Sequence, residues 1–422
     1  MRDSKLLTLP LILALATAFL FTACHKAPFN LANTSNYDLE LNDHAYYVLL
    51  GNELAEGKKF EEAIAAYRKA SRLNPKDAGA MVGLGNVLTE QNKLEEAIAA
   101  YRQALQLNPT NPNDFLAYYG LGNVRERQNK VEEAIAAYRR VIQLIPNDPA
   151  AYISLGRILK KQKKLEEAIS AFNKAISLNP NNAGVYHSLG DALTQQKKLE
   201  QSVVAYRKAI QLDPKYAAGT YVNLGNALKE QKKLKEAIAA YQKATQIGSN
   251  DEAAAGYANL GSVLKEQNKQ NEEIAAYRKA IELEPSDSDI AYFYVQLGNI
   301  LTEQKKSEEA KDAFNKAIAA SRKAIQLNTN NSAAYVGLGL ALDKQNKQEE
   351  AFAAYRKAIQ LEPNLAAAYN GIGLALQRQG KLTEAVEEFK RAIELSPNYS
   401  EDQNNLKQSQ QLLAKQKNRQ PG

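Results

Sequence analysis

The side chains that most often carry chemistry are few in this chain and stand far apart. Its single cysteine, Cys24, lies in LFTACHK at residues 20–26, where the longest apolar run ends, and its three histidines are His25, His44 and His187. One thiol cannot form an internal disulfide, and scattered histidines supply no ligand set for a Cys/His metal cage. We therefore expect neither a bound metal nor another cofactor.

The sequence also lacks the patterns that enzymes commonly need. No Ser/His/Asp or Cys/His set is apparent, and no GxxxxGK[ST] phosphate loop occurs. The 54 Lys and Arg residues and the 47 Asp and Glu residues alternate along the whole chain instead of forming blocks. Such alternation is typical of solvated helix faces. We predict a protein without catalytic activity.

Residues 1–23 have the order of a secretory signal: Arg2 and Lys5 come first, the uncharged apolar run 6–21 follows, and two small residues end it. A helix made of that run would span only about 24 Å, which is short of the roughly 30 Å hydrocarbon core of a bilayer. Pro10 weakens it further. The pattern favours a signal peptide over a permanent transmembrane helix.

The run FTAC at residues 21–24 resembles the lipobox of bacterial lipoproteins. That resemblance implies that Cys24 is lipidated, becomes the new N-terminus, and anchors the protein in the cell envelope, facing the periplasm or the exterior. Phe21 departs from the pattern, which favours leucine there, and Asp3 is unusual among the starting charges. The alternatives are an uncleaved anchor and ordinary cleavage that leaves Cys24 as an incidental thiol. Residues 24–41 are rich in Asn and Ser and are predicted to form a flexible tether.

Beyond the tether, the chain repeats one motif ten times. A Leu-Gly or Ile-Gly pair recurs, most often 34 residues apart, at Gly51, Gly85, Gly122, Gly156, Gly190, Gly225, Gly261, Gly298, Gly339 and Gly373. Sixteen residues after each glycine stands an aromatic residue: Tyr67, Tyr101, Tyr138, Phe172, Tyr206, Tyr241, Tyr277, Phe314, Tyr355 and Phe389. Residues 151–180 illustrate the motif, because their apolar residues are spaced for two amphipathic helices and a proline ends the second.

This spacing of Tyr, Leu-Gly, Ala, Tyr or Phe, Ala and Pro resembles the tetratricopeptide repeat (TPR) family, over residues 44 to about 398. The resemblance implies an all-α fold, a right-handed superhelical solenoid of about ten helix-turn-helix repeats, here assigned to residues 42–398. A single helix pair cannot bury its apolar stripe, so the pairs must stack. Residues 399–422 are predicted to form a polar capping helix and a tail.

In repeat eight the sequence motif of the second helix occurs twice. Within residues 308–328, the motif at Phe314–Ile318 reappears, shifted by seven residues, at Ser321–Ile325. Seven residues add about 10.5 Å of helix and return its face to within about 20°. The sequence predicts a second helix two turns longer than its siblings; the alternative is a break at Ala319–Ser321.

Repeats three and seven each carry a charge at a packing position. Glu273 replaces a small residue, and Arg125 stands where the other nine repeats have leucine. Because an unpaired buried charge is costly, we expect both side chains to tilt outward. Repeats seven to nine also open their second helices with Gln270, Ser307 and Gln348, so we expect this segment to be the least stable.

By the resemblance, the first helix of each repeat lines a concave groove that binds extended peptides or helices. One position after the glycine, the groove residues are Asn52, Asn86, Asn123, Arg157, Asp191, Asn226, Ser262, Asn299, Leu340 and Leu374. Asparagine amides can donate and accept, so such a row could pair with both backbone groups of a ligand strand. The alternative is that they only keep the groove hydrated.

Repeat four is the most basic point of the predicted groove. Arg157, Lys160 and Lys161 lie there, with Tyr119 one repeat before and His187 one repeat after. Aromatic and arginine side chains are common binding anchors, so this region is a candidate for an acidic or amide-rich partner segment. The alternative is a solvated helix face. The dicarboxylate clamp of TPR co-chaperones is not expected, because its lysine positions are not basic here.

These features predict a non-catalytic scaffold that binds other proteins. The alternatives are a substrate-recognition subunit of a separate enzyme, such as a glycosyltransferase, and an RNA-binding helical repeat. The first would need a catalytic domain elsewhere. The second is disfavoured because acidic residues interrupt the basic ones on the inner face: Glu56, Glu90, Asp191, Glu230, Glu266 and Glu303. Assembly of an envelope complex is an expectation that rests only on the resemblance to the TPR family and on the predicted location in the cell envelope.

Overall fold

The computed structural model describes residues 44–107, 114–215, 217–283, 285–396 and 400–417. Within these ranges the regular elements are 21 α-helices, α2 to α22, and no strand is present. The prediction of an all-α helical-repeat fold is therefore confirmed. The predicted signal peptide, Cys24 and the tether lie outside the described residues.

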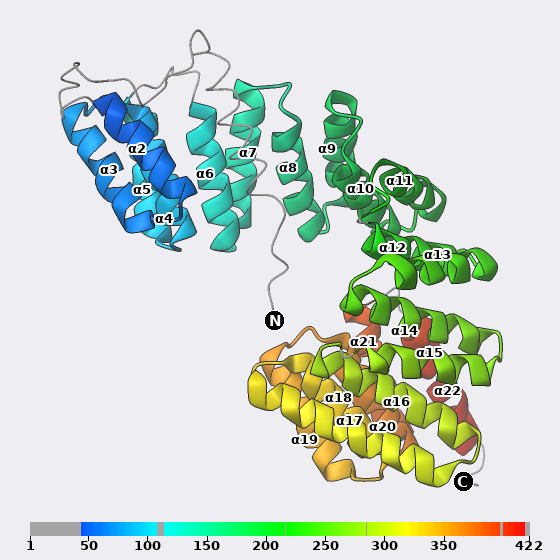
Figure 1. Cartoon of the computed structure of the whole chain (residues 1–422). Coiled ribbons are helices and arrows are strands. Elements are labelled where there is room, and N and C mark those ends of the chain that lie inside the picture. The colour runs from blue at the N-terminus through cyan, green and yellow to red at the C-terminus, as the bar shows by residue number, and fades with distance from the viewer. Residues whose placement is uncertain (1–43, 108–113, 216, 284, 397–399, 418–422) are drawn as a thin grey trace. The chain divides into compact units, whose positions relative to one another are not determined.

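The helices fall into ten successive pairs along the chain, and in nine of these pairs the two helices pack against each other in antiparallel directions (Figure 1). The first helices of repeats one to ten are α2 His44–Glu56, α4 Ala78–Glu90, α6 Asp114–Arg127, α8 Pro149–Lys161, α10 Ala183–Gln195, α12 Ala218–Glu230, α14 Asn250–Glu266, α16 Asp287–Glu303, α18 Ser332–Lys344 and α20 Ala366–Arg378. The second helices are α3 Phe60–Leu73, α5 Leu94–Leu107, α7 Val131–Leu144, α9 Leu165–Leu178, α11 Leu199–Leu212, α13 Leu234–Ile247, α15 Gln270–Glu282, α17 Ser307–Leu327, α19 Gln348–Leu361 and α21 Leu382–Leu395. The final helix is α22, Ser400–Lys417, which packs against α21.

Two compact units divide the chain, Met1–Val124 and Arg125–Gly422, with their boundary inside α6. One hydrophobic cluster, which includes Tyr67 and Tyr101, forms the core of the N-terminal unit. In the C-terminal unit, three clusters follow one another along the stack, around Tyr241, Phe314 and Tyr355. The core is thus distributed from repeat to repeat, as expected when each repeat contacts only its neighbours.

A tight turn joins the two helices of each repeat. In the first nine repeats one turn residue has a left-handed backbone with φ between 57° and 62°: Lys58, Asn92, Asn129, Lys163, Lys197, Lys232, Asn268, Lys305 and Asn346. Repeat ten has Gly380 there. In repeat six, Lys233 N–H donates to the Leu228 carbonyl at 2.9 Å, which caps the end of α12. The turn therefore fixes the antiparallel direction of the second helix.

The repeated glycines lie where an aromatic ring meets the first helix. A Cβ atom added to Gly51 would lie 2.7 Å from a ring carbon of Tyr67, and one added to Gly83 of the next repeat would lie 2.4 Å from the same ring. Tyr67 is 2% exposed. One ring thus fills the space between two repeats, and only glycine leaves room for it at both positions.

The doubled motif of repeat eight lies in one continuous helix. Helix α17 has 21 residues, whereas α19 has 14, so the expected alternative of a break at Ala319–Ser321 is wrong. Its partner α16 also has four residues more than α18. Lys323 of α17 contacts Asp287 at the start of α16 at 3.0 Å, so the two extensions are joined by an ion pair.

Arg125 and Glu273 do not tilt outward, so that expectation is wrong. Arg125 is 7% exposed, and its guanidinium contacts Glu133 at 2.9 Å and Gln128 at 2.8 Å. Glu273 is 2% exposed and has no hydrogen bond or ion pair among the described residues. The ion pair and the hydrogen bond stabilise the charge of the buried Arg125. Glu273 has no such partner, so its burial disfavours the ionised form of its side chain.

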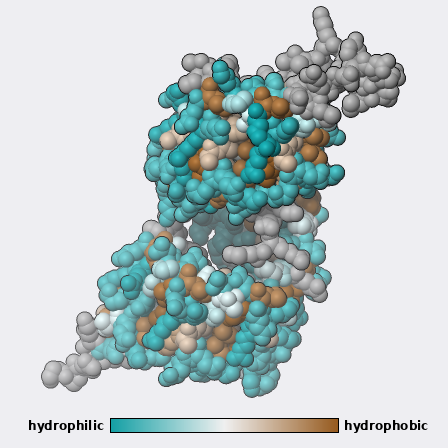
Figure 2. All heavy atoms as spheres, turned by 90° about the vertical axis from the view of Figure 1, so that its left-hand side faces the viewer, coloured by the Kyte–Doolittle hydropathy of each residue, from teal (hydrophilic) through white to brown (hydrophobic). Residues whose placement is uncertain are grey.

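The visible surface in Figure 2 is mostly hydrophilic, with hydrophobic side chains in small separate patches. In the described ranges, no helix combines the length and the apolar composition that a membrane crossing needs.

Candidate partner-binding face

The first helices lie on the inner side of the stack. Helices α12 and α14, α16 and α18, and α18 and α20 contact one another across successive repeats, and α2 and α4 do so in the N-terminal unit. In the described part of the chain, no two successive second helices approach as closely. Helix pairs that are close on one side and spread on the other curve toward the close side. We call the exposed side of the first helices the inner face.

The asparagine row on the inner face is held by tyrosines from the second helices. In three repeats the tyrosine hydroxyl donates to the asparagine Oδ1 fifteen residues earlier: Tyr67 to Asn52 at 2.7 Å, Tyr101 to Asn86 at 2.8 Å and Tyr241 to Asn226 at 2.7 Å. Burial raises the pKa of Tyr67 and of Tyr241, so both hydroxyls stay protonated. Each amide oxygen thus already accepts one hydrogen bond, whereas the NH2 groups of these asparagines have no partner among the described residues and can donate to a ligand.

Repeats eight and nine each keep only one member of the asparagine and tyrosine pair, and each leaves a buried polar atom without a partner among the described residues. Repeat eight has Asn299 but Phe314, and the Asn299 Oδ1 atom is buried and unsatisfied. Repeat nine has Tyr355 but Leu340, and the Tyr355 hydroxyl is buried and unsatisfied. The pairing is therefore a side-chain interaction of each repeat and not a property of the backbone.

Replacing Tyr355 by phenylalanine is expected to stabilise the protein by about 1 kcal/mol, because a buried hydroxyl without a partner is removed. The same change at Tyr241 is expected to destabilise it by about 1 kcal/mol, because Asn226 loses its donor. Urea unfolding followed by circular dichroism measures both changes. Shifts of the same sign in the two variants would contradict this account.

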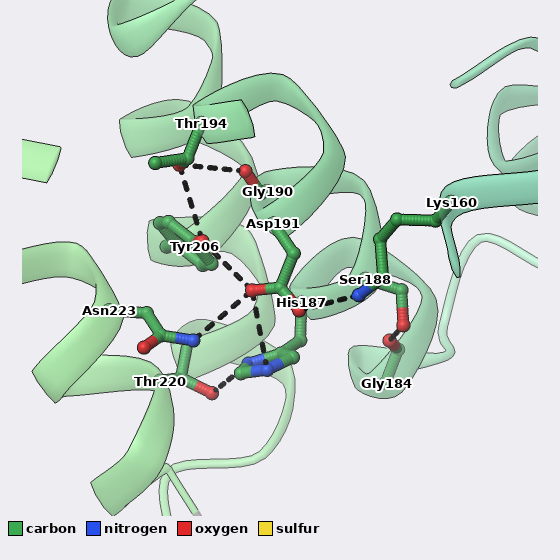
Figure 3. A network of polar contacts seen from close by, with 10 residues as sticks. All are labelled: Lys160, Gly184, His187, Ser188, Gly190, Asp191, Thr194, Tyr206, Thr220 and Asn223. Atoms are coloured by element: carbon green, nitrogen blue, oxygen red, sulfur yellow. Dashed lines mark hydrogen bonds and ion pairs between the residues drawn. The ribbon is translucent and has the colours of Figure 1, made fainter. Parts of the chain in front are cut away.

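Asp191 is the centre of a polar network in repeats four to six (Figure 3). Its carboxylate accepts hydrogen bonds from Lys160 Nζ at 2.8 Å, the Tyr206 hydroxyl at 2.9 Å and Asn223 Nδ2 at 3.1 Å. The His187 Nε2 atom lies 3.7 Å from it. Four side chains from helices α8, α10, α11 and α12 thus converge on one carboxylate.

His187 is positioned by three neighbours. Its Nδ1 atom lies 2.8 Å from the Thr220 hydroxyl, and its ring meets the Tyr206 ring edge to face with centroids 5.9 Å apart. Together with the contact to Asp191, these interactions fix the imidazole between α10 and α12 (Figure 3). The ring is part of the internal network, and its side chain is 32% exposed.

The basic cluster of repeat four is largely neutralised inside the protein. Arg157 contacts Glu126 at 3.0 Å, and the Tyr138 hydroxyl donates to the same carboxylate at 3.3 Å. Lys160 contacts Asp191, as described above. Of the three predicted cations, only Lys161 has no ion pair among the described residues. A partner's acidic segment would therefore have to compete with internal carboxylates at Arg157 and Lys160.

The other predicted groove residues differ in accessibility. Tyr119 is only 8% exposed, so it offers a partner little surface, whereas Asn86 is exposed and Asn123 is half-buried. Glu126, Thr220 and Asn223 belong to the network but were missed by sequence reasoning. Their recurring separation of 31 to 33 residues from their partners, close to one repeat, is the signal that could have found them.

The inner face offers hydrogen-bond donors and charges. Within the described residues, no three His, Cys, Asp or Glu side chains are arranged to hold a metal ion. The amide NH2 groups can bind carbonyl or carboxylate oxygens. Such chemistry suits recognition of a polypeptide.

Stacked helix pairs with a polar inner face define a helical-repeat protein. Models described as tetratricopeptide repeat or TPR repeat match residues 48–112, 127–163, 156–196, 190–231, 216–285, 289–361, 343–380 and 366–399. The chain belongs to the tetratricopeptide repeat family. No curated protein matches it.

Several solved structures resemble parts of the chain. YrrB, described as a TPR protein with an unusual peptide-binding site, is 26% identical over 45% of this chain and 93% of its own, with a TM-score of 0.37. PilF of Pseudomonas aeruginosa is 22% identical over 48% of this chain and 90% of its own, with a TM-score of 0.42. The Cut9–Hcn1 hetero-tetramer of the APC/C is 14% identical over 89% of this chain and 85% of its own, with a TM-score of 0.40.

Proposed function

We propose that this chain is a non-catalytic scaffold that is exported, anchored by lipid at Cys24, and binds a peptide or helix of another protein along its inner face. Membership of the TPR family supports the binding of proteins. The lipobox-like run before Cys24 supports the export and the anchor. The same predicted location in the cell envelope supports a role in assembling an envelope complex.

The observation that carries the binding role is the state of the inner-face asparagines. Asn52, Asn86 and Asn226 have their oxygens bound to tyrosine hydroxyls, and their NH2 groups have no partner among the described residues. The tyrosine contact fixes the orientation of each amide, so little side-chain entropy is lost when a ligand binds. NH2 groups that are held in one orientation on the inner face can donate hydrogen bonds to the carbonyl oxygens of a polypeptide backbone.

Site-specific photo-crosslinking in intact cells tests the binding role. A crosslinking amino acid at position 86, on the inner side of α4, is expected to trap a protein partner. The same amino acid at position 103, on the exposed outer side of α5, is expected to trap little, and it serves as the matched control. Equal trapping at the two positions, or trapping of RNA alone, would contradict the proposal.

A second arm of that experiment tests the anchor. Cells labelled with a tagged fatty acid are expected to show label on the wild-type chain and none on Cys24→Ala, which should also leave the membrane fraction. Label retained by Cys24→Ala would contradict lipidation at this residue without affecting the crosslinking result.

A further inference from the structure

Four cations of repeats four to six are paired with groups of adjacent repeats. The contacts are Arg157 to Glu126 at 3.0 Å, Lys160 to Asp191 at 2.8 Å, Lys197 to Glu230 at 2.8 Å and Lys229 to Ser262 at 2.8 Å. Lys229 also lies 3.9 Å from Glu266. The protein therefore supplies its own partners along this stretch, and a ligand anion would have to displace them.

This pattern stops at repeat seven. Lys265 stands four residues after its repeat glycine, as Lys160 and Lys229 do, yet its ammonium group has no hydrogen bond or ion pair within the described residues. Lys344, at the end of α18, has none either. Its neighbour Asp343 is 1% exposed and is bound to Arg378 of α20, so that carboxylate is not available to Lys344.

Both lysines remain accessible although protein surrounds them. Their side chains are exposed to solvent. Partial burial among the first helices lowers the pKa of Lys344, and the nearby positive charge of Arg378 lowers it further. An ammonium group such as that of Lys344, which is crowded, has no ion pair among the described residues and is still reachable, gains more from an added anion than a fully hydrated one does.

The local charge balance also favours an anion. Lys265, Lys344 and Arg378 supply three positive charges, and Asp343 and Glu303 supply two negative ones, which leaves a net charge of +1 while Glu273 is protonated. Burial raises the pKa of Glu273 to about 7, and its carboxylate cancels this excess charge once it ionises. Gln270 donates to Glu303 at 3.3 Å, so this carboxylate is itself partly engaged. The isolated acids on the face interrupt any continuous basic track of the kind that a nucleic-acid backbone needs.

We propose that Lys265 and Lys344, on the inner face of repeats seven and nine, bind carboxylate groups of an acidic segment in the protein partner. The inference rests on the proposed scaffold function and specifies the chemistry of its ligand. It also moves the acidic-segment site from repeat four, where Arg157 and Lys160 are paired, to repeats seven and nine, whose first helices are α14 and α18 (Figure 1).

Fluorescence anisotropy of the full chain in a non-ionic detergent tests this assignment. The probe is a labelled peptide of alternating glutamate and glycine, and its glutamine analogue is the uncharged control. At low salt the glutamate peptide is expected to bind, and Lys265→Gln/Lys344→Gln is expected to weaken binding about tenfold, which corresponds to about 1.4 kcal/mol. The side chains of the two lysines make no hydrogen bond or ion pair among the described residues, so we expect the variant to fold normally, which circular dichroism checks.

The matched variant is Lys174→Gln/Lys243→Gln, which removes the same charge from the exposed sides of α9 and α13. It is expected to leave the affinity nearly unchanged. An equal loss in both double variants, tighter binding of a single-stranded RNA oligonucleotide at the same lysines, or no binding of the glutamate peptide to the wild type would overturn the assignment. In that last case, trapping at position 86 would still support the scaffold function, so the two failures are distinguishable.

Discussion

Replacing Glu273 by alanine is expected to stabilise repeat seven by about 3 kcal/mol at pH 9, and this gain is expected to disappear at pH 4. Burial raises the pKa of Glu273 from 4.5 to about 7, and the charge of Glu303 adds to the rise while Lys265 opposes it. A shift of one pKa unit corresponds to about 1.36 kcal/mol. Eight of the ten repeats already have alanine at this position, so the smaller side chain fits the packing.

The direction of the pH dependence follows from which state holds the proton more tightly. The folded protein binds the Glu273 proton more tightly than the unfolded chain does, because the folded pKa is the higher one. The wild type therefore loses stability as the pH rises from about 4.5 to about 7, and above that it carries the full penalty. Glu273→Ala removes this dependence.

Hydrogen exchange of the α15 amides at several pH values, normalised to intrinsic exchange rates, measures the local effect. Repeat arrays do not always unfold in one step, so a local probe is preferable to a single global free energy. The matched variant is Glu272→Ala, which removes an exposed glutamate that contacts Lys269 at 3.3 Å. Its effect should stay within about 0.5 kcal/mol. A wild type whose α15 protection does not vary with pH would refute the argument.

Gly225→Ala is expected to destabilise the protein by about 2 kcal/mol. The new Cβ would lie 2.5 Å from one ring carbon of Tyr241 and 2.7 Å from another, so the ring or the helix must move. Tyr241 is 0% exposed and its hydroxyl donates a hydrogen bond to Asn226, so the ring has no free space into which it can move. Overpacking of this kind typically costs about 1 to 3 kcal/mol.

The same substitution in the same helix, Gly219→Ala, provides the control. Its Cβ would meet nothing closer than a Glu252 oxygen at 3.7 Å. Because alanine favours helix more than glycine does, this change is expected to stabilise the protein by about 0.5 kcal/mol. Thermal and urea unfolding compare the two. A loss at Gly219 as large as that at Gly225 would show that helix propensity or alanine itself, and not the ring contact, determines the cost.

The comparison of the first and the tenth repeat shows how much of the fold the sequence encodes locally. Gly51 and Gly373 each stand sixteen residues before an aromatic ring, and in both repeats that ring packs on the glycine. Helix pairs, turns and the ring-to-glycine contact need only residues of one repeat and the next, so the periodic pattern predicts them. The two extra turns of α17 likewise follow from a motif that occurs twice, whereas the longer α16 was not predicted.

The sequence by itself thus determined the all-helical repeat fold, the number of repeats and the row of inner-face positions. Only the tertiary structure decided which of those positions remain available to a ligand. The Asn226 oxygen accepts a hydrogen bond from Tyr241, and Lys160 forms an ion pair with Asp191. Lys344 forms no ion pair in the described part of the chain. The physical reason is that each of these contacts depends on how neighbouring helices are rotated and spaced, and residue types alone do not specify that geometry.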